Sequence, residues 1–295
     1  MPFDFFDIKS DLQYQKWRSQ KLRTYDVGTH AQPVTINNAD QLSLLEISNL
    51  LSRCNAYNFV IYALQDQAQS SKRFVYELGI LLGLKHLNGN LCADEDNISS
   101  IQVRDNGRQS GYIPYSNKKL TWHTDGYYNK PSETIRAMIL HCVQPAQSGG
   151  ENWLLDHEVA YIQLRDQNPH YVKAFLQPDV LTIPANIENG KEIRAVQSGS
   201  VFSKHEASST LHMRFSARTR NIEWKNNVVT QEAVACMNEL LNTNNPYITT
   251  CRMKSGEGII ANNTLHNRTA FEDGQHKRLL YRARYYDRVK HQISP

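Results

Sequence analysis

The sequence predicts a mostly β fold, a double-sheet jelly roll with flanking helices. From about Ile101 onward, short apolar segments alternate with turn residues and few helical patterns lie among them, which is typical of a jelly roll. The chain has 295 residues, 40% hydrophobic and 21% charged, as in an ordinary globular protein. One large domain can reach this length. We therefore expect a single domain over 1–295, with a mixed α/β part (1–100) packed on a core (101–295).

In the first hundred residues the apolar spacing predicts three helices and one buried strand. The helices are expected over 4–23, from about 38 to 51 and over 71–84, where Gly83 ends the last one. Phe59–Leu64 is β-branched and aromatic, so we expect it to be a core strand.

The remaining chain is expected to supply the strands of the jelly roll. Strands are predicted over 135–143, 180–184, 193–197, 211–215, 248–253, 258–262 and 278–287. Helices are predicted between them, over 156–168, 170–176 and 230–242.

Composition excludes several classes of partner. The net charge is only +4 and the basic residues are dispersed, which disfavours nucleic acid. No apolar run approaches the roughly 20 residues that cross a bilayer. Asp4 and Asp7 stand where a secretory signal would be positive, and the five cysteines form no C-x-x-C pair, so we expect reduced thiols and a cytoplasmic location. The expected partner is a small-molecule substrate, and a homo-oligomer is left open.

A His-x-Asp motif is the first candidate metal site. His123 and Asp125 are two residues apart in an extended segment, so their side chains point to the same side. Two histidines and one carboxylate on one face of a metal leave positions open for a co-substrate and dioxygen, as non-haem Fe(II) oxygenases require. The pattern alone is also compatible with a surface turn and a helix-capping aspartate. A second imidazole must come from a distant strand, and His266 follows a strand that runs into a turn.

An unusual pattern of arginines follows His266. Strand alternation places Arg278, Arg282 and Arg284 on one face, with Leu280 among them. An arginine that faces the inside of a jelly roll needs an anionic partner, because an unpaired buried charge is costly. The guanidinium matches a carboxylate in bidentate fashion, so a dicarboxylate co-substrate would satisfy it. A solvated outer face is the alternative, and for Arg284 it stays open.

These motifs together resemble the taurine dioxygenase-like superfamily of Fe(II)/2-oxoglutarate oxygenases, which includes gamma-butyrobetaine hydroxylase and clavaminate synthase. The resemblance rests on Trp-His-Thr-Asp at 122–125, Ser-Gly-Gly at 148–150, the distal histidine in Asn-Asn-Thr-Leu-His at 262–266, and Lys-Arg-Leu-Leu-Tyr-Arg at 277–282. It covers roughly residues 112–287. It implies a double-stranded β-helix core and oxidative decarboxylation of 2-oxoglutarate to succinate, with Fe(II), 2-oxoglutarate and O2 as cofactors.

The resemblance also implies roles for single residues. His123, Asp125 and His266 become iron ligands, and Arg278 becomes the partner of the distal carboxylate of 2-oxoglutarate. Arg282 matches a position that reaches the co-substrate or an anionic substrate. One departure is Asn152, which stands where the family often has a threonine that binds 2-oxoglutarate; an amide can donate the same hydrogen bond. Asp125 argues against halogenation, because halogenating relatives replace this carboxylate with a small residue.

Several nearby residues have two interpretations. Tyr112 and Tyr127 flank the metal motif and either line the mouth of the pocket or pack against it. Arg214 and Arg218 either face the site or form a salt-bridged surface. His141 lies in an apolar run, where a core histidine is favoured.

The predicted function is an Fe(II)- and 2-oxoglutarate-dependent dioxygenase, a hydroxylase of a small polar or anionic/zwitterionic molecule. Two alternatives use the same fold. One is a cupin-like isomerase or hydrolase that holds another metal through the same three ligands, and the other is a non-catalytic jelly-roll binding protein. A buried arginine at position 278 distinguishes the first of these, since only a dicarboxylate-using enzyme needs it.

Overall fold

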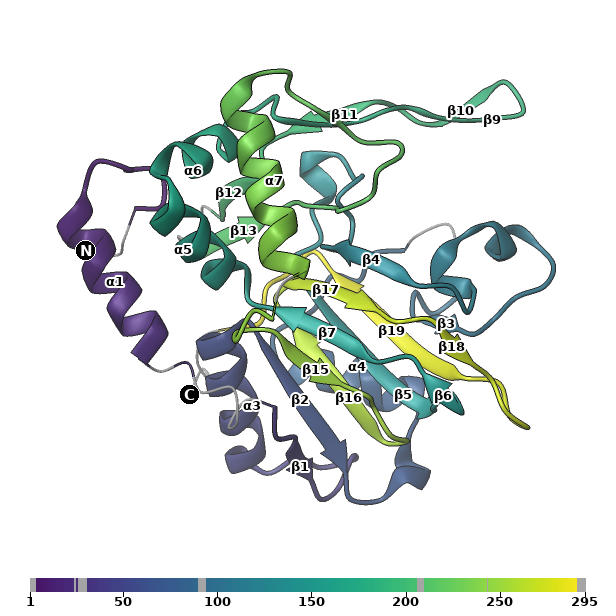
Figure 1. The fold of residues 1–295 in the computed structure, drawn as a ribbon. Helices are drawn as coiled ribbons and strands as arrows, with labels where there is room; N and C mark the ends of the chain where they lie inside the picture. The colour runs from purple at the N-terminus through teal and green to yellow at the C-terminus, as the bar shows by residue number, and fades with distance from the viewer. Residues whose placement is uncertain are drawn as a thin grey trace. The chain divides into compact units, whose positions relative to one another are not determined.

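A computed structural model describes residues 4–23, 25, 31–89, 94–205, 210–242 and 244–290 of the chain (Figure 1). It separates into two compact units, each assembled from three stretches of chain. Unit 1 contains Met1–Tyr25, Thr121–Thr134 and Leu155–Ile248, and unit 2 contains Asp26–Leu120, Ile135–Leu154 and Thr249–Pro295. The expectation of a single domain over 1–295 stays a prediction.

Unit 2 is built on a six-stranded sheet. Its order is β1 (Val34–Ile36), β2 (Phe59–Leu64), β16 (Glu257–Ala261), β5 (Ala137–Gln144), β19 (Leu279–Tyr285) and β3 (Ser99–Ile101). β1 and β2 pair in parallel, and the other neighbours pair antiparallel. The sheet therefore joins strands from both ends of unit 2, and Phe59–Leu64 forms the strand that its composition predicts.

Two helices contribute to the main core of unit 2. They are α3 (Leu44–Tyr57) and α4 (Lys72–Leu81), whose apolar side chains pack with those of the sheet in one cluster. Ser43 and Glu46 form a capping box at the start of α3, which satisfies backbone N–H groups that the helix cannot pair itself. This cap explains why the helix begins at Leu44 and not near residue 38 as predicted.

The pairing of β19 with β5 determines which side chains face the helices. Ala283 and Tyr285 belong to the apolar cluster, and Tyr281 packs against it. The alternate residues Leu280, Arg282 and Arg284 point to the opposite face of the sheet, as the sequence predicts. The register shifts between Leu279 and Leu280, a bulge that the sequence did not reveal.

Smaller sheets complete unit 2. Strands β15 (Thr249–Cys251), β7 (Asn152–Leu155) and β17 (Leu265–Arg268) are neighbours in that order, and β6 (Ser148–Gly149) pairs with β18 (Phe271–Glu272). Short 3-10 turns lie at Gln67–Gln69, Arg108–Gly111 and Ile113–Tyr115.

Unit 1 is mainly helical with short strands. Its helices are α1 (Asp11–Arg23), α5 (His157–Gln167), α6 (Pro169–Phe175) and α7 (Val228–Asn242), and a 3-10 turn spans Pro131–Glu133. Its strands are β4 (Leu120–His123, from Thr121 on), β8 (Leu181–Ile183), β9 (Asn186–Glu188), β10 (Lys191–Arg194), β11 (Gln197–Gly199), β12 (Phe202–His205), β13 (Thr210–Met213) and β14 (Glu223–Trp224). Strand β8 lies between β11 and β14, while β9–β10 and β12–β13 are separate pairs.

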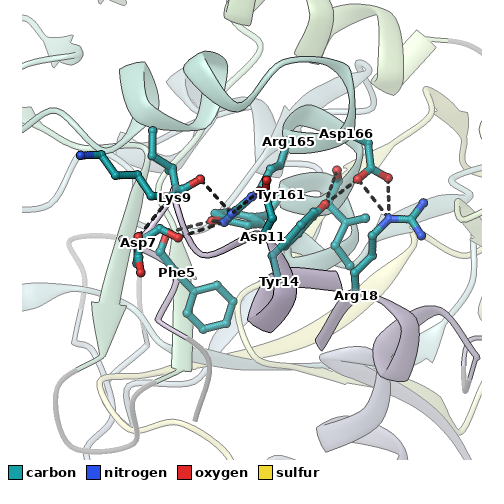
Figure 2. Close-up of polar contacts among 11 residues, drawn as sticks. Phe5, Asp7, Lys9, Asp11, Tyr14, Arg18, Tyr161, Arg165 and Asp166 are labelled. Atoms are coloured by element: carbon teal, nitrogen blue, oxygen red, sulfur yellow. Dashed lines mark hydrogen bonds and ion pairs between the residues drawn. The ribbon is translucent and has the colours of Figure 1, made fainter. Parts of the chain in front are cut away.

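Arg165 on α5 fixes the N-terminal segment within unit 1 (Figure 2). Its guanidinium lies 4.0 Å from the ring centroid of Tyr14 and donates to the carbonyl of Ile8 at 3.2 Å and to the hydroxyl of Tyr161 at 3.1 Å. The hydroxyl of Tyr14 donates to Asp166 at 2.6 Å. A buried guanidinium is thus satisfied by carbonyls, a hydroxyl and a ring.

The first helix is shorter than predicted. It begins at Asp11, whereas the prediction began at Asp4. The carboxylates of Asp4 and Asp7 accept hydrogen bonds from the backbone N–H groups of Phe6 and Lys9, which favours turns over helix.

No helix in the described part of the chain is both long enough and apolar enough to span a bilayer. The cysteines at 54, 142, 236 and 251 form no disulfide with one another, and Cys92 lies outside the described residues.

Candidate functional site

The His-x-Asp motif lies at the end of β4 in unit 1. Its backbone is held by the segment after β13, since His123 pairs with Ser216 and the N–H of Thr124 donates to Phe215 O at 3.0 Å. Trp122 is buried and donates from Nε1 to Leu241 O in α7, so it packs and anchors the strand. The motif is therefore presented on a rigid strand end.

His123 and Asp125 lie on the same side, as strand alternation predicts. Nε2 of His123 is 3.6 Å from Oδ1 of Asp125, and both side chains are buried. Nδ1 of His123 contacts the carbonyl of Thr121 at 2.8 Å. Since a carbonyl only accepts, Nδ1 carries the proton and Nε2 carries the lone pair that a metal would use.

His266 is presented in the same way in unit 2. It lies on β17, is buried, and its Nδ1 donates to the carbonyl of Thr264 at 2.9 Å. Each histidine thus uses the carbonyl two residues before it to fix its tautomer. The turn before β17 is held by Asn263, which has a left-handed backbone (φ 50°) and donates to Ile135 O at 2.6 Å.

Arg278 projects into a pocket of unit 2. The pocket is lined by Cys142, Pro145, Ala146, Gly149, Gly150, Arg252, Met253, Arg278 and Leu280. The Arg278 residue is only 4% exposed, and burial lowers its pKa to about 10. Its backbone N–H donates to Asp273 at 2.8 Å. Within the described ranges, no carboxylate forms an ion pair with its guanidinium.

Gly149 shapes this pocket. Its φ of +68° is left-handed, and a Cβ there would lie 2.2 Å from the carbonyl oxygen of Ala270. Only glycine allows β6 and β18 to approach this closely. The adjacent Gly150 lies against Arg278, with 3.5 Å between its ideal Cβ position and Nε of the arginine.

Arg268 is a buried residue beside this pocket that the sequence analysis did not single out. It is 4% exposed and donates to the carbonyls of Pro114, Ser116 and Lys118. The ring of Phe271 lies 4.8 Å from the guanidinium carbon of Arg268 and 4.9 Å from that of Arg278. Burial and the nearby Arg278 lower the pKa of Arg268 to about 9. Its position two residues after the predicted ligand His266 could have pointed to this arginine from the sequence.

The other predicted residues lie at different places. Asn152 is buried on β7, and its Nδ2 has no hydrogen-bond partner among the described residues, but it does not line the Arg278 pocket. Arg284 is buried and donates to Oδ1 of Asn88 at 2.7 Å, so the protein itself supplies it with an acceptor. Arg282 is half-buried on the same strand face.

The two candidate tyrosines belong to different units. Tyr112 is half-buried between two 3-10 turns of unit 2. Tyr127 is buried in unit 1, with its ring edge-on to the His123 ring at a centroid distance of 6.4 Å. Of these two tyrosines, Tyr127 therefore lies beside His123, a predicted iron ligand of the same unit.

Comparison with known proteins identifies the family. The taurine catabolism dioxygenase TauD, TfdA family matches residues 34–284. The chain therefore belongs to this dioxygenase family. The fold prediction is confirmed as well: it is mostly β with flanking helices and a jelly-roll core, as in the solved structures that it resembles.

Individual relatives are more distant. A uridine-5'-phosphate dioxygenase from Streptomyces sp is 30% identical over 98 residues, which are 32% of this chain and 35% of that protein, so the match spans about a third of the relative. The structure of AAD-2 in complex with Mn(II) and N-oxalylglycine aligns with a TM-score of 0.60 and 12% identity, covering 87% of this chain and 96% of that one. The structure of PvcB, an Fe, alpha-ketoglutarate dependent oxygenase, aligns with a TM-score of 0.52 and 14% identity over 87% and 84%.

Proposed function

We propose that the chain is an Fe(II)- and 2-oxoglutarate-dependent dioxygenase that hydroxylates a small polar or anionic/zwitterionic molecule. In this reaction the substrate C–H, 2-oxoglutarate and O2 yield the alcohol, succinate and CO2. Membership of the dioxygenase family supports the proposal. The observation that carries it is Arg278, a buried guanidinium that points into a pocket without a carboxylate partner among the described residues.

We assign the iron to His123, Asp125 and His266. Two imidazole nitrogens and one carboxylate oxygen form the donor set that Fe(II) oxygenases use. The ring orientations support this assignment, because each Nδ1–H is held by a backbone carbonyl, which leaves each Nε2 to bind a metal. Bound iron would supply the activation of dioxygen that is coupled to decarboxylation of the keto acid.

We assign the distal carboxylate of 2-oxoglutarate to Arg278. A bidentate pair with a carboxylate would offset the desolvation of the guanidinium. Apolar side chains of the pocket, Met253 and Leu280 among them, would limit the access of water to that pair. Asn152 could donate its amide to the same co-substrate. Arg282, Arg284, Tyr112 and Tyr127 remain proposed substrate contacts, and of these Tyr127 is placed beside His123.

The curated relative named above acts on uridine-5'-phosphate, an anionic molecule, which supports an anionic substrate here. Cys142, Cys236 and Cys251 are reduced thiols, which supports a reducing compartment, and we propose the cytoplasm.

The test is succinate release that requires both added Fe(II) and 2-oxoglutarate, with a panel of anionic small molecules screened for stimulation. Arg278→Gln should raise the 2-oxoglutarate concentration that succinate release requires by a factor of roughly 100 or more, while Lys277→Gln, a change at the exposed neighbouring residue, should not. Turnover of a substrate without 2-oxoglutarate would favour a cupin-like isomerase or hydrolase. Binding of a small molecule with no metal-dependent turnover would favour a non-catalytic binding protein.

A further inference from the structure

Unit 1 carries a cluster of basic and aromatic side chains next to the His-x-Asp motif. We call it the Tyr–Arg cluster, and it consists of Tyr127, Tyr128, Arg194, Arg214 and Arg218. These residues come from the loop after β4, from β10 and from the segment after β13. None of these residues belongs to the iron or 2-oxoglutarate assignment, and Tyr127 alone among them is a proposed substrate contact.

The contacts of the cluster form a chain that begins at the motif. The ring of Tyr127 lies edge-on to His123, and its hydroxyl accepts a hydrogen bond from Nη1 of Arg218 at 3.2 Å. Tyr128 packs edge-on against Tyr127 with 5.2 Å between the ring centroids. The guanidinium carbon of Arg194 lies 5.9 Å from the centroid of Tyr128. Two guanidiniums thus flank a pair of tyrosines, one ring away from His123.

Arg214 supports this arrangement from within the protein. Its guanidinium donates to the carbonyls of Tyr127 at 2.7 Å, Leu181 at 2.9 Å and Gln197 at 3.0 Å. It therefore fixes the backbone that carries the tyrosines, and it brings a third positive charge. Burial and the nearby Arg194 lower the pKa of Arg214 to about 10.

The charge of the cluster depends on whether acidic side chains pair with its arginines. None of its three arginines forms an ion pair with a carboxylate in the portion of the chain that the structure describes. Two other cations of unit 1 are paired: Arg18 contacts Asp166, and Lys225 contacts Asp179 at 2.8 Å. Three neighbouring guanidiniums without carboxylates produce a strongly positive local field, which favours an anion from outside the protein.

We propose that the Tyr–Arg cluster binds the oxyanion group of the prime substrate, and that this group is a dianion such as a phosphate monoester. Arg218 and Arg194 would donate charge-assisted hydrogen bonds to it, and the hydroxyl of Tyr127, which accepts from Arg218, would donate its own proton to a substrate oxygen. An oxyanion held there would leave the rest of the substrate to extend along the Tyr127 ring toward His123. This inference rests on the proposed function and specifies its substrate class.

The experiment measures anion binding without turnover. Metal-free protein is titrated calorimetrically with inorganic phosphate, sulfate and acetate at low ionic strength, for the wild type and for Arg218→Gln and Arg194→Gln. Arg220→Gln is the matched control, because this arginine is exposed on the same segment and outside the cluster. Arg278→Gln is included to detect phosphate that binds in the 2-oxoglutarate pocket instead of at the Tyr–Arg cluster. Succinate release is measured separately on the same preparations.

We expect phosphate to bind more tightly than acetate, and each cluster variant to weaken phosphate binding roughly tenfold or more, as the loss of one charge-assisted hydrogen bond does. The two control variants should bind phosphate like the wild type. Absence of phosphate binding, equal affinity in all variants, or a loss confined to Arg278→Gln would overturn the inference. Normal succinate release in such a case would show that the proposed function survives and only the substrate class is wrong.

Discussion

Replacement of Arg278 should change stability and co-substrate affinity in opposite directions. In the ligand-free protein the guanidinium is buried without a carboxylate, and the lowering of its pKa to about 10 corresponds to a penalty of about 3 kcal/mol on the charged form. Arg278→Met keeps the aliphatic stem and removes this penalty. We therefore expect the metal-free variant to be more stable than the wild type by about 1–3 kcal/mol.

Affinity for 2-oxoglutarate should fall at the same time. A bidentate pair with the distal carboxylate contains two charge-assisted hydrogen bonds, each worth about 1.5–3 kcal/mol. Their loss should weaken binding by a factor of roughly 100 or more. The free energy of unfolding is measured by denaturant titration of metal-free protein, and the affinity by anaerobic calorimetry in the presence of Fe(II).

Arg268→Met is the matched control. This arginine is equally buried and stacks on the same ring of Phe271, but its Nη atoms donate to backbone carbonyls. Burial also lowers the pKa of Arg268, but its removal leaves the carbonyls of Pro114, Ser116 and Lys118 without their donor, so Arg268→Met should be less stable than Arg278→Met by about 2–4 kcal/mol. Destabilisation of the protein by Arg278→Met would refute the assignment of Arg278 as a buried guanidinium that binds the carboxylate of 2-oxoglutarate. Normal 2-oxoglutarate binding by this variant would refute it as well.

Three further changes test other parts of the structure. Gly149→Ala should destabilise by about 2 kcal/mol or more, because the left-handed backbone and the carbonyl of Ala270 leave no room for a Cβ; unchanged unfolding in denaturant would contradict this. His141 is fully buried beside Tyr62, and burial lowers its pKa from 6.5 to about 4. Between these two pH values the unfolded state binds a proton that the folded state does not. The free energy of unfolding should therefore fall by up to about 3 kcal/mol as the pH drops through this window. His141→Gln should flatten the unfolding free energy over this pH window, and an unchanged slope would exclude His141 as its source. Arg165→Met should lose about 2–4 kcal/mol of unfolding free energy and speed trypsin cleavage after Lys9, as mass spectrometry of the early fragments would show; equal cleavage rates would contradict the anchoring of the N-terminal segment by Arg165 (Figure 2).

Alternation along a strand made part of this site predictable. The arginines of β19 and the apolar residues between them follow a period of two, so the face that they share could be deduced before the sheet was known. The same rule placed His123 and Asp125 on one side of an extended segment. The apolar strand Phe59–Leu64 was predicted with its correct boundaries because its β-branched and aromatic residues favour a strand.

Features that depend on distant partners were not predictable. The bulge between Leu279 and Leu280 exists only in relation to β5, and nothing in the local sequence marks it. Arg268 and Arg214 donate to backbone carbonyls of segments that are distant in the sequence. Every residue has such a carbonyl, so no sequence pattern marks these contacts. The start of α3 at a capping box was missed although Ser43 and Glu46 carry its pattern, since the earlier Asn38 and Asp40 offered a competing start.

The most direct test of the proposed function is an anaerobic Fe(II) titration of the wild type and of His123→Ala, Asp125→Ala and His266→Ala, with 2-oxoglutarate present and its visible absorption band monitored. His170→Ala is the control, because this histidine is exposed on α6. We expect one Fe(II) per chain for the wild type and the control, and affinity lowered by roughly a hundredfold or more in each ligand variant. Wild-type iron affinity in His266→Ala would contradict the proposal that His266 is an iron ligand.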